Sequence, residues 1–456
     1  MKISLNGEQC GEPWVGKLTL PEDRHEQWRF ELIRNTDPGG NPFAIELPFE
    51  GKSTLCGLIN FQTPCTLVYP LATTVDPGSI GVYHTHSRQR TEGIFQALVS
   101  QSAIADIDEP KFCGFRFSSD SFLAWFGRRG FDSSLVEGSH MRQTTALPQE
   151  NVTFQIAGFG SVTCRSGSLG HTSTWEDSFK SAASISIEFE EIQSLKDSMQ
   201  WCWKFETLFQ FLTGINTKWP DFTLVHEQTY ILGEDERNCE SELIFGRTPY
   251  SQSERSHPFE CGHNSDRGGA DLGSILANFF KSESIFERIQ VINYTRFAKR
   301  SIADDFAMVV PVLEKYLRGT HVGLTEQNFL DHQEAFFKYI ERSDDRHIHE
   351  FAKKHVAIKD TKAPSLKTIL WRSAESLNAS GFSISRNLTD RIANLFHRGV
   401  GGGDEKDAKR MWTEAEGAAA LLSLNTYRDL GIDISALEPG RTGNCEIAHF
   451  FARDAN

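Results

Sequence analysis

The sequence contains no long hydrophobic run, and no stretch approaches the ~18 consecutive apolar residues that a membrane-spanning helix requires. Its first twenty residues lack the basic start and apolar core of a secretory signal peptide. The nine cysteines are odd in number, scattered, and form no C-x-x-C pair, which favours reduced thiols over a disulfide framework. We therefore expect a cytoplasmic protein with no membrane partner.

Several catalytic signatures are absent as well. The sequence has no GxxxxGK[ST] motif, no GxGxxG after a predicted strand, no HExxH and no GxSxG. Nucleotide hydrolysis, dinucleotide-dependent redox chemistry, zincin proteolysis and α/β-hydrolase activity therefore lose their usual sequence support.

The composition is that of a folded protein of more than one domain. The chain has 456 residues, of which 39% are hydrophobic and 24% charged, with 34 Phe and 9 Trp. Global disorder is excluded by this supply of large apolar side chains, and the length favours two domains.

The first half of the chain has the alternating pattern of β-strands. Residues 17–20, 152–156 and 184–189 alternate with a period of two, and Gly, Pro and Asp punctuate the runs. We predict an antiparallel, sandwich-like β-rich domain over residues 1–232. One short helix at 120–126 interrupts it, and a helix at about 192–213 ends it.

The second half has helical periodicity, which predicts an α+β protein whose C-terminal domain is all-α. Residues 233–270 are polar and rich in Gly and Ser, and we expect a linker or surface excursion there. The domain over 271–456 is expected to contain helices at 271–281, 284–298, 301–317, 325–342, 345–356, 365–378, 387–398 and 405–427.

Nearly all of the net negative charge lies in residues 1–270. The net charge of the whole chain is −14, which argues against a protein that coats nucleic acid. However, residues 1–270 carry −13 of it, whereas residues 346–410 contain 13 Lys or Arg and 7 Asp or Glu, a local net charge of +6. Local charge therefore permits RNA binding by the helical half, and the acidic half could restrain it.

Two groups of potential metal ligands remain open. His84 and His86 lie on one face of a predicted strand, and Cys239, His257, Cys261 and His263 could gather a zinc ion. Neither spacing fits a common site, so we expect ordinary structural roles and no metal or other cofactor.

The segment 387–398 carries the most informative pattern. On a helix, Leu388, Ile392 and Phe396 share one apolar face. Polar side chains gather on the opposite face: Asp390, Arg391, Asn394, His397 and Arg398. A purely structural interpretation is that Arg391 pairs with Asp390 or Glu405 and that His397 favours the helix C-terminus.

These groups suit metal-free RNA cleavage. A histidine with a pKa near neutrality can transfer the proton of a ribose 2′-OH that attacks the adjacent phosphate, and an arginine can stabilise the charge that develops. The products would be a 2′,3′-cyclic phosphate and a 5′-OH.

The spacing of Arg391 and His397 resembles the R-x(4–6)-H motif of HEPN ribonucleases. Three other segments, Gly11–Thr19, Ser119–Phe126 and Glu206–Gly214, resemble elements of the ApeA N-terminal domain. The resemblance implies an antiphage defence protein that cleaves host RNA such as tRNA, acts as a homodimer or higher homo-oligomer, and responds to a phage-derived trigger. It also implies a sensing or regulatory role for the β-rich domain over residues 1–232. It implies catalytic roles for Arg391, His397 and Asn394.

The same resemblance implies that neighbouring polar residues bind the RNA, namely Arg386, Asn387 and Arg398. Two positions differ from the usual motif: Ile392 follows the arginine where a polar residue is common, and Arg398 separates His397 from the glycine. These differences favour, as the alternative, a catalytically inactive HEPN-like module that binds RNA or protein. A metal-dependent enzyme that uses His84 and His86 is a second alternative.

Overall fold

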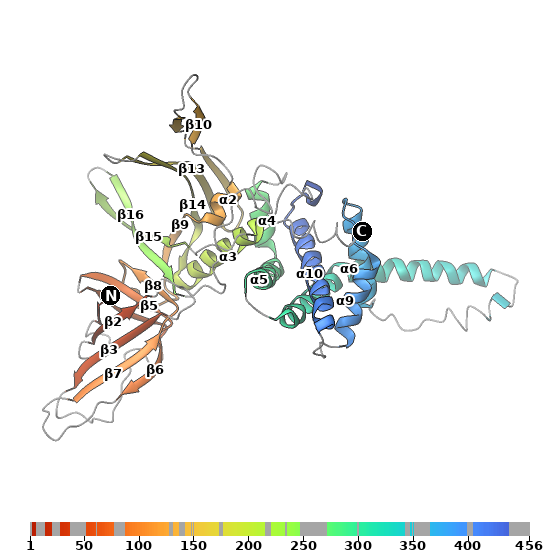
Figure 1. The fold of residues 1–456 in the computed structure, drawn as a ribbon, viewed down its shortest axis with the longest axis horizontal. Coiled ribbons are helices and arrows are strands. Elements are labelled where there is room, and N and C mark those ends of the chain that lie inside the picture. Colours follow the sequence, from red (N-terminus) through yellow and green to blue (C-terminus); the bar gives the residue numbers. More distant parts are fainter. Residues whose placement is uncertain are drawn as a thin grey trace. The chain divides into compact units, whose positions relative to one another are not determined.

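The computed structural model describes most of the chain (Figure 1). The described residues are 2–5, 14–20, 28–36, 52–60, 62–76, 87–126, 131–135, 142–146, 148, 150–172, 177–214, 220–232, 235–246, 271–298, 301–342, 347–348, 350, 365–398 and 405–436. The chain divides into two compact units. Unit 1 comprises Met1–Asp266 and Asp271–Ala277, and unit 2 comprises Arg267–Ala270 and Asn278–Asn456.

Unit 1 is built from β-strands. They are β1 (Lys2–Leu5), β2 (Val15–Thr19), β3 (Arg29–Thr36), β4 (Thr54–Ile59), β5 (Thr63–Val68), β6 (Leu71–Asp76), β7 (Ser87–Ile94), β8 (Ala97–Ser100), β9 (Pro110–Phe117), β10 (Phe131–Leu135), β11 (Arg142–Ala146), β12 (Glu150–Ile156), β13 (Gly160–Thr172), β14 (Asp177–Ser194), β15 (Phe222–Leu232) and β16 (Asp235–Phe245).

The strands form one continuous antiparallel sheet and one separate hairpin. The sheet has 14 strands in the order β12-β13-β14-β9-β15-β16-β8-β5-β4-β1-β2-β3-β7-β6, and β10 pairs only with β11. Neighbours in sequence often pair directly; for example, β13 and β14 align from Gly160↔Phe189 to Thr172↔Asp177. The antiparallel β-rich region followed by a helical region confirms the expected α+β class.

Two helices cover part of this sheet, and both were expected from the sequence. α2 (Asp120–Phe126) begins where Ser119 Oγ accepts a hydrogen bond from Phe122 N at 3.0 Å. α3 (Leu195–Thr213) ends at Gly214, whose φ of 71° is the left-handed conformation of a helix C-cap. Phe205 of α3 packs edge-on against Phe115 of β9, with ring centroids 5.7 Å apart, so the helix closes the apolar face of the sheet.

The expectation of a linker over 233–270 is wrong for residues 235–245. These residues form β16, which pairs with β15 and β8 inside the sheet. The outer half of the β15–β16 hairpin is exposed, so its sequence lacks the apolar alternation that marks a half-buried strand. Residues 247–270 lie outside the described part of the chain.

Unit 2 is helical. Its elements are α4 (Leu272–Lys281), α5 (Glu283–Phe297), α6 (Ile302–Glu341), α8 (Leu366–Asn378), α9 (Arg386–Arg398), α10 (Glu405–Asp429) and the short 3-10 helix η2 (Ile434–Ala436). The first residues of α4, up to Ala277, belong to unit 1. The expected helices at 271–281, 284–298, 365–378, 387–398 and 405–427 are confirmed to within two residues at each end.

One predicted helix boundary is wrong. The segments 301–317 and 325–342 were expected to be separate helices, but α6 runs through both. Glycines at 319 and 323 lower helix propensity by about 1 kcal/mol each relative to alanine, but without a left-handed cap they do not end a helix. Of the expected helix at 345–356, only 347, 348 and 350 are described, and they are helical.

α10 packs against α5, α6 and α9 and forms the centre of unit 2. Its residues 420–427 are all buried, as are Ile289 and Ile292 of α5. Among the described residues, no helix combines the length and the apolar character needed to cross a membrane.

Candidate functional site

The turn before α9 is fixed by local hydrogen bonds. Asn378, the last residue of α8, donates from Nδ2 to the carbonyl of Ile384 at 3.0 Å and accepts from its N–H at 2.7 Å. Gly381 has a φ of 98°, which side chains other than glycine rarely allow. Ser385 Oγ then accepts a hydrogen bond from Leu388 N at 3.2 Å and caps the first turn of α9.

α9 has the two faces that its sequence predicts. Leu388, Ile392 and Ala393 are at most 1% exposed, and Thr389 is buried beside them. The opposite face presents exposed side chains, namely Arg386, Asn387, Asn394 and His397. The helix therefore uses one face for packing and leaves the other for solvent or a ligand.

Arg391 lies at the border between these faces and is held by an acidic residue of α10. Its Nε donates to Oε1 of Glu414 at 2.9 Å. The Glu414 side chain is 1% exposed and that of Arg391 is 22% exposed. Asp390, one of the two partners expected for Arg391, pairs instead with Lys367 of α8 at 2.8 Å. The side chain of Glu405, the other expected partner, lies outside the described part of the chain, so that pairing stays a prediction.

Arg391, Asn394 and His397 occupy successive turns of α9. Residues three apart are neighbours on a helix surface, and each step rises by about 4.5 Å along the axis, so the first and last are separated by about 9 Å. His397 lies in the last turn of the helix. Its ring contacts that of Phe396, with centroids 6.0 Å apart.

The residues predicted to bind RNA have different surroundings. The guanidinium of Arg386 lies 5.5 Å from the ring centroid of Trp371 of α8, which holds it by a cation–π contact at the start of α9. Asn387 is exposed one residue later. Arg398 is the last residue of α9, and its side chain lies outside the described residues.

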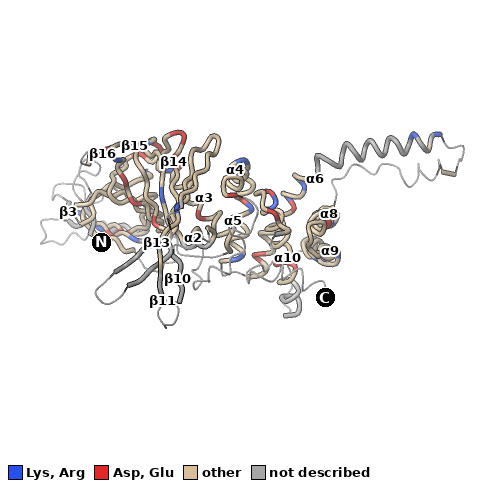
Figure 2. Tube along the Cα trace, turned by 90° about the horizontal axis from the view of Figure 1, so that it is seen from above, with Lys and Arg blue, Asp and Glu red and all other residues tan. Residues whose placement is uncertain are grey.

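Helices α8 and α9 carry more basic than acidic residues. Figure 2 shows basic positions on both helices and acidic positions along strands of unit 1. The two helices carry five basic and two acidic residues: Lys367, Arg372, Arg386, Arg391 and Arg398 against Glu375 and Asp390. A surface with this excess of cations attracts phosphate groups.

The arrangement combines the groups that a metal-free phosphodiester cleavage requires. An exposed imidazole can accept or donate a proton, an oriented guanidinium can stabilise an anionic phosphorane, and an amide between them can donate to or accept from a ribose or phosphate. These groups stand on one rigid helix rather than on a loop.

Whether the potential metal ligands named from the sequence lie close together stays a prediction. His84, His86, His257, Cys261 and His263 lie outside the described residues, whereas Cys239 lies half-buried on β16. Within the described ranges, no group of three or more His, Cys, Asp and Glu side chains could hold a metal ion.

Sequence reasoning missed the residue that orients Arg391. Glu414 lies 23 residues away, and its buried position became evident only from the packing of α9 on α10. A signal exists in retrospect: Glu414 falls at helical spacing with Ala418, Leu421 and Leu422, which are all buried. An acidic residue within such an apolar stripe indicates a buried partner.

Comparison with known proteins identifies the first unit. The family model described as ApeA N-terminal domain 1 matches residues 11–279, more than half of the chain. The match contains all three N-terminal segments that carry the resemblance, and it ends before α9. No curated protein and no solved structure matches the chain.

Proposed function

Because the chain belongs to the ApeA N-terminal domain 1 family, which indicates an antiphage defence protein, we propose that unit 2 is a HEPN-type endoribonuclease. It would cleave host RNA, such as tRNA, without a metal ion and thereby stop phage propagation in the infected cell. Unit 1 would sense a phage-derived trigger and regulate the nuclease.

The observation that carries this proposal is the polar face of α9. It presents Arg391, Asn394 and His397 on successive turns of one helix, with Arg391 oriented through its Nε by the buried Glu414. An arginine used only for surface solubility has no need of a partner that is 1% exposed. Orientation of a guanidinium by a fixed carboxylate is the arrangement expected of an arginine that acts on a phosphate.

The proposed reaction is an internal transesterification. The ribose 2′-oxygen attacks phosphorus, the bond from phosphorus to the 5′-oxygen breaks, and the products are a 2′,3′-cyclic phosphate and a 5′-OH. A base must accept the 2′-OH proton and an acid must protonate the leaving 5′-oxygen, so two proton-transfer groups are needed. His397 is one of them, and Arg391 stabilises the charge on the phosphorane oxygens.

A second copy of the chain would supply the second imidazole. Pairing two α9 faces would place two His397 residues and two Arg391 residues around one phosphate, so we propose a homodimer or a higher homo-oligomer as the active state. Arg386, Asn387 and Arg398 would bind the RNA on either side of the cleaved bond. Specific cleavage activity should then fall on dilution below the dissociation constant of the dimer, whereas a site complete in one chain would be insensitive to dilution.

The deciding experiment is cleavage of total RNA in EDTA by the full chain. His397→Ala should abolish cleavage, and its melting temperature should not change because the residue is exposed. His347→Ala is a matched control, because His347 is also an exposed histidine in a helical part of unit 2. Cleavage that requires added metal, or that survives His397→Ala, would refute the mechanism.

A specific observation favours a second candidate, an inactive HEPN-like module that binds RNA or protein. Ile392, at the position where the family commonly has a polar residue, is 0% exposed and belongs to the core. Asn394 is then the nearest exposed polar side chain after Arg391. RNA binding without any cleavage product would identify this candidate.

A further inference from the structure

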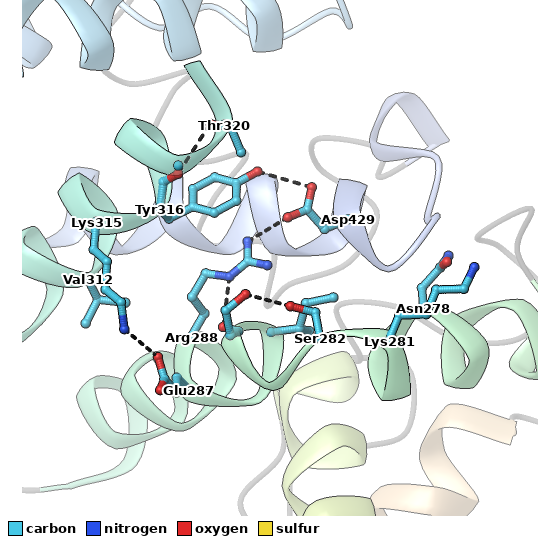
Figure 3. A pocket seen from close by; sticks show the side chains of 13 residues that line it. Asn278, Lys281, Ser282, Glu287, Arg288, Val312, Lys315, Tyr316, Thr320 and Asp429 are labelled. Atoms are coloured by element: carbon cyan, nitrogen blue, oxygen red, sulfur yellow. Dashed lines mark hydrogen bonds and ion pairs between the residues drawn. The ribbon is translucent and has the colours of Figure 1, made fainter. Parts of the chain in front are cut away.

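Unit 2 contains a cavity that the proposed nuclease reaction does not use. It has a volume of about 480 Å³ and is formed by the end of α4, the start of α5, the middle of α6 and the end of α10 (Figure 3). Cavities of about 300–1,000 Å³ are typical of small-molecule sites. The candidate nuclease residues of α9 do not line it.

A buried ion pair forms the centre of the cavity. Arg288 of α5 is 3% exposed, and its Nη1 lies 2.8 Å from Oδ2 of Asp429. The Tyr316 hydroxyl donates to Oδ1 of Asp429 at 3.1 Å, and the Arg288 guanidinium stacks 4.1 Å from the Tyr316 ring centroid. Three helices are thus joined by one network, and Figure 3 shows it between two other basic side chains.

The cavity has an excess of positive charge. Lys315 stands at one end, paired with Glu287 at 3.1 Å, and Lys281 stands at the other end beside Asn278. Both carboxylates at the cavity are therefore engaged by a cation. Among the residues that the structure describes, no carboxylate pairs with Lys281, so its charge remains available to an anion.

Hydroxyl donors lie next to Lys281. Ser282 is the N-cap residue of α5, but its side chain makes no cap bond; its Oγ lies 2.7 Å from Oγ of Ser284 instead. Both hydroxyls line the cavity. Several donors close to one cation suit a phosphate group, which offers several acceptor oxygens. Ile285 and Val312 add an apolar part to the wall.

Gly319 is one of the residues that line the cavity. It lies inside α6, where glycine is about 1 kcal/mol less favourable than alanine. A Cβ at this position would meet no atom within 4 Å, so the packing does not require glycine there. The cavity lining therefore has no side chain at this position.

We propose that this cavity binds a phosphorylated small molecule of nucleotide size. The phosphate lies against Lys281 and the hydroxyls of Ser282 and Ser284, and the rest of the ligand covers Ile285 and Val312. The volume is far larger than a phosphate group alone needs. The ligand joins the end of α4 to α5 and α6, so its binding stabilises the helical unit. This inference is independent of whether α9 cleaves RNA.

Calorimetric titration of the full chain tests the proposal. The probes are the four nucleoside 5′-monophosphates and ribose 5-phosphate, with adenosine and ribose as unphosphorylated controls. At least one phosphorylated probe should bind and raise the melting temperature, and its unphosphorylated counterpart should not. Lys281→Gln should weaken binding about tenfold through loss of a charge-assisted hydrogen bond, whereas Lys338→Gln, exposed on α6 outside the cavity, should not.

A steric pair of variants separates binding from folding. Gly319→Leu should abolish binding by filling the cavity while keeping or raising the melting temperature, because leucine favours the helix and meets no atom at its Cβ. Gly319→Ala should retain binding. The proposal is wrong if no phosphorylated probe binds at millimolar concentration, if Gly319→Leu binds as the wild type does, or if only a 5′-phosphorylated RNA and no small molecule occupies the site.

Discussion

Replacement of Arg391 should destabilise the protein, whether or not this residue is catalytic. Arg391→Ala removes the partner of the Glu414 carboxylate, which is 1% exposed and lies 2.9 Å from Arg391 Nε. Breaking a buried ion pair by removing one partner costs about 3–5 kcal/mol. Arg391 itself is 22% exposed, so water reaches the pair from one side and the expected loss is about 3 kcal/mol.

A double variant separates this stability effect from catalysis. In Arg391→Met with Glu414→Leu, both charges are replaced by apolar side chains of similar length, which is often neutral for a buried pair. We expect the free energy of unfolding to return to within about 1 kcal/mol of the wild-type value. Cleavage should stay absent, because the guanidinium that stabilises the phosphorane is still missing.

The assays are urea denaturation followed by circular dichroism, and cleavage of total RNA in EDTA. A loss below about 0.5 kcal/mol in Arg391→Ala would refute the view that the pair is desolvated, because surface substitutions stay within that range. Cleavage restored in the double variant would refute the catalytic role of Arg391. Glu414→Gln is a third variant to compare. It should lower the free energy of unfolding less than Arg391→Ala does. It should also lower the cleavage rate, because a neutral amide holds the Arg391 guanidinium less firmly than the carboxylate does.

Three further predictions concern stability. Burial, with a smaller contribution from Lys111, lowers the pKa of His226 from its usual 6.5. As the pH decreases, the unfolded chain therefore binds a proton at His226 before the folded chain does. The free energy of unfolding should thus fall below about pH 6.5. His226→Gln should flatten this dependence in denaturation curves from pH 7.5 to 5.5; an equally steep curve would contradict the assignment. Gly114→Ala should lower the free energy of unfolding by about 3 kcal/mol, because the added Cβ would collide with the Ile187 carbonyl oxygen. Gly214→Ala has open space around the Cβ and should lower it by only about 1 kcal/mol. Equal losses in the two variants would be inconsistent with this packing. Ser385→Ala should cost about 1 kcal/mol through loss of the α9 cap, measured by urea denaturation, and no change would mean that the cap is dispensable.

Elements with strong local signals were predictable from sequence. α2 and α3 combine apolar periodicity with serine caps, and α3 ends at a glycine that adopts the left-handed conformation. The two faces of α9 follow from helical spacing alone, since Leu388 and Ile392 are buried while Asn394 and His397 are exposed. Spacing and caps are local properties, so a single sequence contains them.

Elements that depend on distant partners were not predictable. β16 is polar along its outer half, and only its pairing with β15 and β8 makes it a strand. α6 continues through Gly319 because no left-handed cap interrupts the helix there. For β16 the local composition favours a loop, and pairing with the neighbouring strands overrides it. For α6 the glycines lower helix propensity without ending the helix.

The sequence by itself determined the α+β division, the concentration of net negative charge in residues 1–270, and the position of Arg391, Asn394 and His397 on one helix. Only the tertiary structure decided which carboxylate holds Arg391 and which basic side chains meet around the cavity at Arg288. The physical reason is that periodicity specifies which side of a helix is buried, whereas an ion pair depends on how two helices pack. Glu414 and Arg391 are 23 residues apart, and the packing of α9 on α10 brings them to 2.9 Å.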